Sequence, residues 1–241
     1  MHWYELDSNN RLTKRRDIQI SIDNSRYQLI PKAEARPFLI DWNRDGIEDL
    51  VVSLQVANKS DGRVTPSSFS PKLFVKTGSQ SRRNDTAKRL AQGRDRNSPV
   101  NGFTPPGGAD LVVALEPFDL GDEIEDRWRK FKSERWRVFA EFTFGDLDSD
   151  GTTDLIFSEQ LVRLGIDEET GLQKVERRHS GLYWMKNTSL TGTPKFFGIQ
   201  KIYDSDQAIL SIASADFDQD GKLDIVAQTS TGVLNLLSQS R

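Results

Sequence analysis

Cysteine is absent from the 241-residue chain, and histidine occurs only as His2 and His179. The lack of cysteine excludes a disulfide scaffold, a zinc site with thiolate ligands and a cysteine nucleophile. His2 lies at the start of the chain and His179 in an arginine-rich segment, and no serine-centred motif accompanies either. The sequence therefore indicates no catalytic triad, and we expect a protein without catalytic residues.

Long apolar runs are also missing, so no segment has the length of a bilayer-spanning helix. The chain opens MHWYELDSNN, which turns polar within six residues and lacks the basic start and apolar middle of a signal peptide. This opening indicates either a cytosolic protein or a Met1 that is not the natural start. The net charge is only -3, so we expect neither nucleic-acid binding nor membrane insertion.

Aspartate, in contrast, is strongly clustered. Eleven of the 24 aspartates lie in three nine-residue windows, 41–49, 146–154 and 216–224. The windows read DWNRDGIED, DLDSDGTTD and DFDQDGKLD, and all three fit the pattern D-x-[DN]-x-D-G-x-x-D. They are strongly acidic, whereas the rest of the chain carries a net positive charge. Clustered carboxylates repel one another unless a cation joins them.

The spacing within each window suits a hard cation with oxygen ligands. Side chains at positions 1, 3 and 5 of a tight loop can point inward, position 7 offers its carbonyl, and glycine at position 6 permits the sharp turn. Calcium takes about six to eight such oxygens, whereas magnesium demands near-octahedral geometry and keeps its waters. We therefore predict up to three calcium sites. The predicted ligands are Asp41, Asn43, Asp45, Ile47 and Asp49 in the first loop, Asp146, Asp148, Asp150, Thr152 and Asp154 in the second, and Asp216, Asp218, Asp220, Lys222 and Asp224 in the third.

Two other structures share part of this pattern. An EF-hand needs a bidentate glutamate at position 12 and flanking helices, but position 12 here is Val52, Phe157 or Ala227, and short apolar runs typical of strands follow each window. Solvated turns between strands are the remaining alternative, because Asp, Asn and Gly are common in turns. Because Asn43 replaces a carboxylate, we predict that the first calcium site is the weakest.

The windows and their flanks resemble the FG-GAP and VCBS repeats, which also form the β-propeller at the head of integrin α chains. The segment SIASADFDQDGKLDIVAQ (211–228) is the nearest match, and Phe144 and Gly145 resemble the Phe-Gly element. A later Gly-Ala-Pro element is missing, so a looser VCBS-like member is favoured over an integrin-like one. The resemblance implies an all-β propeller, either small with about four blades or part of a larger ring, in which each calcium loop joins two strands of one blade.

This resemblance predicts one domain over residues 1–241. The expected parts are an outer half-blade over 1–36, a calcium blade over 37–78, an insertion or degenerate blade over 79–135, a second calcium blade over 136–207, and an inner half-blade with the third loop over 208–241. The two half-blades can complete each other if the ring closes. The degenerate blade is suggested by ADLVVAL (109–115), which is similar to EDLVVSL (48–54).

Other patterns predict local structure. DEIEDRWRKFK (122–132) places Ile124, Trp128 and Phe131 on one helical face, with acids first and bases last, so we expect a short helix. Alternation from Trp136 to Phe144 predicts a strand, and the Thr-Gly turn in 159–178 predicts a long hairpin. Six basic residues between Arg82 and Arg96 lie in an expected surface loop.

The function expected from these observations is a calcium-stabilised, noncatalytic scaffold that binds a protein or a glycan. Calcium sites of extracellular modules fill only at millimolar calcium, which favours an extracytoplasmic location. The alternative is a polysaccharide lyase or glycoside hydrolase whose basic insertion grips an anionic glycan. Convergent Arg, Tyr and His side chains in a pocket away from the metal loops would favour that alternative.

Overall fold

The computed structural model describes residues 2–6, 12–30, 35–59, 63, 69–77, 111–134, 136–190, 192–232 and 234–237. Within these ranges the chain is mostly β-strand and contains one helix, which confirms the predicted all-β class. Also within them, no helix combines the length and the apolar character that crossing a membrane requires. The basic stretch from Arg82 to Arg96 and the start of ADLVVAL lie outside the described residues.

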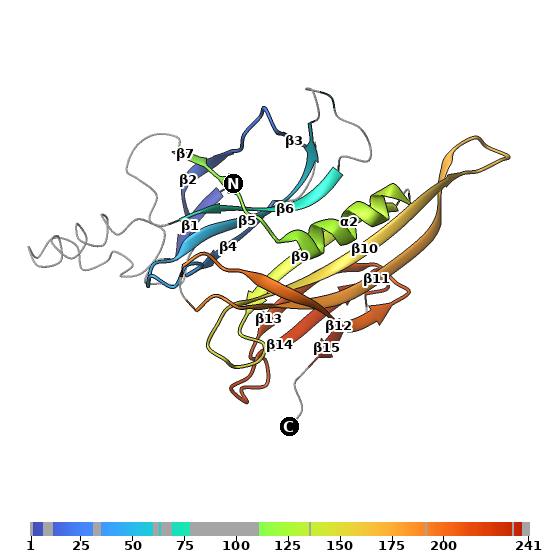
Figure 1. Cartoon of the computed structure of the whole chain (residues 1–241). Coiled ribbons are helices and arrows are strands. Elements are labelled where there is room, and N and C mark those ends of the chain that lie inside the picture. The colour runs from blue at the N-terminus through green and yellow to red at the C-terminus, as the bar shows by residue number, and fades with distance from the viewer. Residues whose placement is uncertain are drawn as a thin grey trace, which may run out of the picture.

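Four sheets make up the described fold (Figure 1). The first contains β1 (His2–Leu6), β2 (Leu12–Ser21) and β7 (Leu111–Ala114), and β2 and β7 run parallel. The second contains β3 (Tyr27–Leu29), β4 (Ala35–Ile40), β5 (Asp49–Asn58), β6 (Phe69–Lys76) and β8 (Glu116–Pro117). The third is antiparallel in the order β12 (Phe196–Ser205), β11 (Gln173–Asn187), β10 (Asp154–Ile166) and β9 (Trp136–Gly145). The fourth contains β13 (Ile209–Ala215), β14 (Asp224–Thr229) and β15 (Leu234–Leu237).

Three of these sheets share one feature, an acidic loop that joins two antiparallel neighbours. The loops connect β4 to β5, β9 to β10 and β13 to β14. Their registers are equivalent, because the closing aspartate pairs with the residue before the loop: Asp49 with Ile40, Asp154 with Gly145 and Asp224 with Ala215. The loops therefore lie between strands, as predicted, and the exclusion of an EF-hand is confirmed.

The ends of the chain belong to separate sheets. In the described residues, β1 pairs with β2, and β2 pairs with β7, while β13 to β15 pair among themselves. No described pairing joins the two end segments. The similar segments ADLVVAL and EDLVVSL have different strand neighbours. β7 pairs with β2 in parallel, whereas β5 is central to its antiparallel sheet.

The strands that precede the three acidic loops meet through polar side chains. Arg36 on β4 forms an ion pair with Glu141 on β9 at 2.7 Å and donates to Ser211 Oγ on β13 at 3.3 Å. Thr143 on β9 and Ser214 on β13 are joined by a hydrogen bond of 2.8 Å. β4, β9 and β13 therefore converge on one polar junction.

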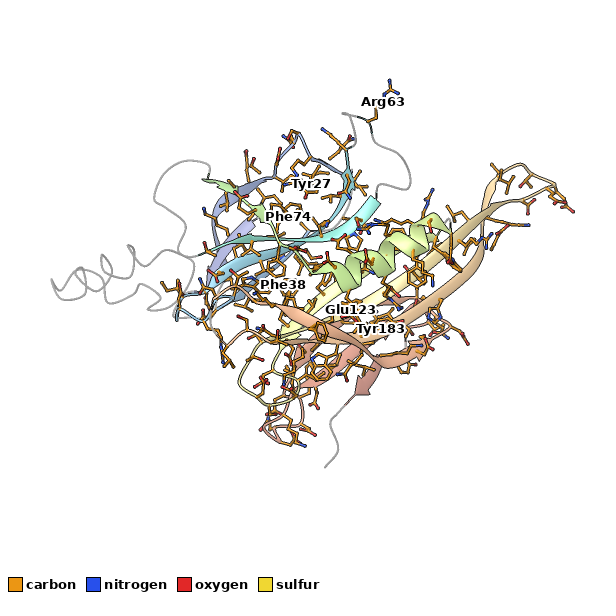
Figure 2. The ribbon with its side chains drawn as sticks, viewed as in Figure 1. Tyr27, Phe38, Arg63, Phe74, Glu123 and Tyr183 are labelled. Atoms are coloured by element: carbon orange, nitrogen blue, oxygen red, sulfur yellow. The ribbon has the colours of Figure 1, made fainter. Side chains whose placement is uncertain are left out.

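Helix α2 (Asp122–Ser133) matches the predicted short helix. Its Ile124 and Trp128 are buried and Phe131 is half-buried, so the apolar face predicted from their spacing packs into the main core with residues of β9 and β10. Glu123 in its first turn accepts hydrogen bonds from the backbone N–H groups of Gly198 and Ile199, both at 2.9 Å, which ties the helix to β12 (Figure 2). A separate apolar cluster includes the edge-to-face pair of Tyr27 and Phe74 (Figure 2).

The hairpin of β10 and β11 is longer than its neighbours and projects from the rest of the molecule as a two-stranded ribbon (Figure 1). The last pairing to β9 is Arg163 with Trp136, and the pairing to β12 begins at Ser180. Residues 164–179 thus have no further strand beside them among the described residues. Near the tip, Ile166 and Leu172 are 67% and 68% exposed. The long hairpin predicted for this segment is confirmed.

Candidate metal centres

The three acidic loops have the same backbone conformation. A non-glycine residue at position 4 and the glycine at position 6 both have positive φ in each loop. The φ values are 59° and 79° for Arg44 and Gly46, 59° and 83° for Ser149 and Gly151, and 62° and 85° for Gln219 and Gly221. These are left-handed conformations, which glycine adopts readily and other residues adopt only at a cost. The motif glycine is thus explained by the turn itself.

The loops also share their internal hydrogen bonds. In the third loop, the Asp216 carboxylate accepts from the N–H groups of Asp220 and Gly221, both at 3.0 Å. Asp224 Oδ2 accepts from the N–H of Phe217 at 2.9 Å. The corresponding bonds are present in the first and second loops. Backbone donors therefore hold the carboxylates of positions 1 and 9 in place.

These bonds gather the predicted ligands of two loops. One acidic oxygen each from Asp146, Asp148 and Asp154 lies within 4.8 Å of the others, and the same holds for Asp216, Asp218 and Asp224. The remaining carboxylates, Asp150 and Asp220, accept from the N–H of position 7, as Asp45 does in the first loop. Ile47, Thr152 and Lys222 occupy this position 7, where only the backbone carbonyl was predicted to be a ligand.

The first loop differs in composition. Asp41 accepts from the N–H groups of Asp45 and Gly46, but Asn43 occupies position 3, and its Nδ2 donates to Asp45 Oδ2 at 3.3 Å. Asp49 is fully buried. Its Oδ2 accepts from Trp42 N at 3.0 Å. An amide in place of a carboxylate leaves this loop with three predicted ligand carboxylates, against four in each of the other two.

The third loop contains an unsatisfied carboxylate oxygen. Asp224 is fully buried, and its Oδ1 has no hydrogen-bond partner in the part of the chain that the structure describes. A buried charged oxygen without a donor costs several kcal/mol, on the order of a lost charged hydrogen bond or more. Because one oxygen each of Asp216, Asp218 and Asp224 lies within 4.8 Å of the others, a cation between them would contact all three carboxylates. The residues of the third loop therefore fit a divalent ion.

The second loop has the same carboxylates in a different setting. Both oxygens of Asp154 have donors, Leu147 N at 3.1 Å and Asn187 N at 2.8 Å, and its burial raises the pKa of the Asp154 carboxyl. Lys186 forms ion pairs with Asp148 and with Asp150, the latter at 2.8 Å. This ammonium group lowers the pKa of Asp150 to about 2, and the two carboxylates raise the pKa of Lys186 above its usual value.

The first and second loops are in direct contact. Arg44 at position 4 of the first loop donates to the carbonyl of Gly151 in the second and, at 3.0 Å, to the carbonyl of Leu190. Gly192 N donates to Asn43 O at 3.1 Å. The sequence pattern does not indicate either cation, because the packing of neighbouring sheets brings Arg44, and strand register brings Lys186, to the second loop. The motif itself contains no sign of these contacts.

A second charged cluster lies under helix α2, away from the loops. Glu159 on β10 is fully buried and accepts from Arg127 Nε at 2.9 Å, from Arg127 Nη2 at 2.7 Å and from Trp128 Nε1 at 2.9 Å. Arg127 also donates to the buried Tyr183 hydroxyl at 2.9 Å and lies over its ring. Burial raises the pKa of Tyr183, so its hydroxyl stays protonated.

This cluster anchors the helix to the sheet. Every polar group in it has a partner inside the protein, and Tyr183, labelled in Figure 2, is buried beneath the helix. His179 lies nearer the start of β11 than Tyr183 and contacts Asp204 at 3.3 Å. The one indication of this cluster in the sequence is a charged residue, Glu159, in the middle of the strand segment LIFSEQLV (155–162).

No family model, curated protein or solved structure matches this chain. The chemistry of the loops is therefore the basis for assigning a function. Oxygen-only ligands, held by backbone donors and closed by a buried aspartate, can bind a hard divalent cation. The described loops offer neither a nitrogen nor a sulfur ligand in these groups, which disfavours zinc and copper chemistry.

Proposed function

We propose that this chain is a calcium-stabilised, noncatalytic β-propeller that serves as a scaffold outside the cytoplasm and binds a protein or a glycan. The observation that carries the proposal is the third loop, where the buried Asp224 Oδ1 lacks a donor and the Asp224 carboxylate is grouped with those of Asp216 and Asp218. A calcium ion there offsets two of the three clustered negative charges and supplies the missing partner of Asp224. Asp216, Asp218, Asp220 and Asp224 would hold it, together with the carbonyl of Lys222.

Calcium acts in this proposal by stabilising the folded state. An ion that binds only the assembled loop adds RT ln(1 + [L]/Kd) to the free energy of unfolding. Dissociation constants of extracellular calcium modules are about 0.1–1 mM, so such loops fill outside the cytoplasm and stay unfilled at cytosolic calcium. This is the reason for proposing an extracytoplasmic location.

The arrangement of the sheets supports the propeller. Each loop joins two neighbouring antiparallel strands of one sheet, as the resemblance to VCBS-type repeats implies for a blade. The strands that precede the loops, β4, β9 and β13, meet at the junction of Arg36, Glu141 and Ser211. Convergence of equivalent strands is what blades around one axis require. We accordingly propose that these three sheets are neighbouring blades.

The proposed ligand is a protein or a glycan because a propeller scaffold presents loops and strand edges and no reaction centre of its own in the described part. Beneath the helix, Arg127 donates to both Glu159 and Tyr183, and these contacts anchor α2.

The test of the proposal is thermal unfolding of the whole chain with calcium and with a chelator. We expect a higher melting temperature in calcium, and we expect Asp218→Ala to reduce this gain. Asp167→Ala is the matched control, because Asp167 caps the exposed turn of the β10–β11 hairpin by accepting from Glu169 N and Thr170 N at 3.1 Å, far from any acidic loop. It should change stability equally in both buffers. If calcium does not change the melting temperature of the unchanged chain, of Asp218→Ala or of Asp167→Ala, the proposal is refuted.

A further inference from the structure

The second and third loops have the same aspartates at positions 1, 3, 5 and 9 but differ in one external side chain. Lys186 at the end of β11 contacts the carboxylates of Asp148 and Asp150 in the second loop. In the described residues, no lysine, arginine or histidine forms an ion pair with a carboxylate of the third loop. The two loops are thus a matched pair with and without a bound ammonium group.

The position of Lys186 is fixed by its neighbour. Asn187 is 3% exposed, and its N–H donates to Asp154 Oδ1 at 2.8 Å while its Nδ2 donates to Thr153 O at 3.2 Å. Thr152 Oγ1 also contacts Asn187 O at 3.3 Å. The backbone beside Lys186 is therefore clamped to the second loop, so the lysine side chain starts from a rigid point next to the carboxylates.

Strand register makes this lysine specific to the second loop. In each sheet, the residue after the closing aspartate pairs with a residue on the next strand. This partner is Lys76 for the first loop, Met185 for the second and Leu237 for the third. One residue further along, the second loop has Lys186 and the first has Thr77. Thr77 carries no charge, so the first loop lacks an ammonium group from this position.

We propose that Lys186 is a tethered cation that competes with calcium for the second loop, so that the third loop fills at lower calcium than the second. This inference rests on the proposed calcium binding. An ammonium group between two carboxylates provides part of the neutralisation that a divalent ion would provide, and calcium must displace it before it can contact Asp148. As a second consequence, Lys186 keeps the second loop folded when calcium is scarce.

The expected size follows from one displaced charge. Removal of the single competing ammonium charge should tighten calcium binding by about five- to tenfold. The third loop should not change.

The experiment is a calcium titration of the full chain followed by the backbone amide resonances of Gly46, Gly151 and Gly221. These three glycines donate to the first aspartate of their own loops, so each resonance reports on one loop. In the unchanged protein we expect the Gly221 resonance to shift at lower calcium than that of Gly151. In Lys186→Met we expect the Gly151 midpoint to fall by about five- to tenfold and the Gly221 midpoint to stay in place.

Lys201→Met is the matched control, because Lys201 on β12 is also a surface lysine paired with one aspartate, Asp204, at 2.9 Å. It should leave all three midpoints unchanged. Lys186→Gln should reproduce the effect of Lys186→Met, and both should lower the melting temperature in chelator but not in calcium. Coincident midpoints for Gly151 and Gly221, together with no response to Lys186→Met, would overturn the inference while leaving calcium binding intact. If no glycine resonance responds to calcium, the proposed function itself fails, and the inference with it.

Discussion

Asp224→Asn should have opposite effects on stability with and without calcium. Asparagine keeps an oxygen that can accept from Phe217 N, and it removes the negative charge whose Oδ1 lacks a donor. Its new amide group can donate to Asp216 or Asp218, which have oxygens within 4.8 Å. In chelator the substitution therefore replaces a repulsive buried charge with a hydrogen-bonded amide.

The magnitude can be worked from the geometry. Carboxylate charges up to 4.8 Å apart repel by about 1 kcal/mol per pair in water, and by several times more at an effective dielectric constant of about 20. Asp224 takes part in two such pairs, so after screening by salt we expect a gain of about 1–2 kcal/mol in chelator. In about 10 mM calcium, a site with a dissociation constant of about 0.1–1 mM contributes about 1.4–2.7 kcal/mol, and the variant loses this contribution.

The assay is urea unfolding in the two buffers, supported by calorimetry. For a chain of this size, 1 kcal/mol corresponds to about 2–4 °C in melting temperature. Asp167→Asn serves as the control, because this exposed carboxylate caps a turn outside the loops. If Asp224→Asn lowers stability equally in both buffers, Asp224 is an ordinary structural residue and the cation-centred account of the third loop is wrong.

Two further predictions concern the helix. Arg127→Met should cost about 3–5 kcal/mol, because it leaves the buried Glu159 carboxylate without its ion-pair partner. The double variant with Glu159→Met should cost only about 1–3 kcal/mol, mainly for the unpaired Trp128 N–H, and additive losses in urea unfolding would contradict this. Burial lowers the pKa of Lys132 to about 8, against 10.5 for an ordinary lysine. Between these two pH values the unfolded chain therefore binds more protons than the folded chain, and the free energy of unfolding rises with pH. Lys132→Met should remove this rise, measured as the difference in unfolding free energy between pH 8 and 10; an unchanged slope would show that other groups cause it.

The local elements were predictable because their causes are local. The spacing of Ile124, Trp128 and Phe131, with acids before bases, defines a helix whatever it packs against. Likewise, the aspartates and the glycine of each acidic loop contain the information for the turn, since backbone N–H groups of the same loop fix the carboxylates. The predictions of strands after each loop succeeded for the same reason.

Contacts between residues far apart in the sequence were not predictable in this way. Lys186 is 38 residues from Asp148 in the sequence, and Arg44 is 107 residues from Gly151. Nothing near either residue indicates its partner, because strand register and the packing of neighbouring sheets bring them together. The same applies to Glu159, whose partners lie on a helix 31 and 32 residues earlier. The prediction that the first site binds calcium most weakly depends only on the residues within the loops. It does not include Lys186, the cation that contacts the second loop from another strand.

The projecting ribbon of residues 164–179 has a practical consequence. Its backbone bonds run between two strands only, so its amide hydrogens should exchange by local opening, while those at the base of β10 exchange only when the whole sheet opens. The tip can accordingly be shortened, or can accept an inserted label or a fused domain, without disturbing the core. A fluorophore placed there would stand clear of all three aspartate loops and could report on tumbling or capture on a surface while the rest of the molecule remains as it is.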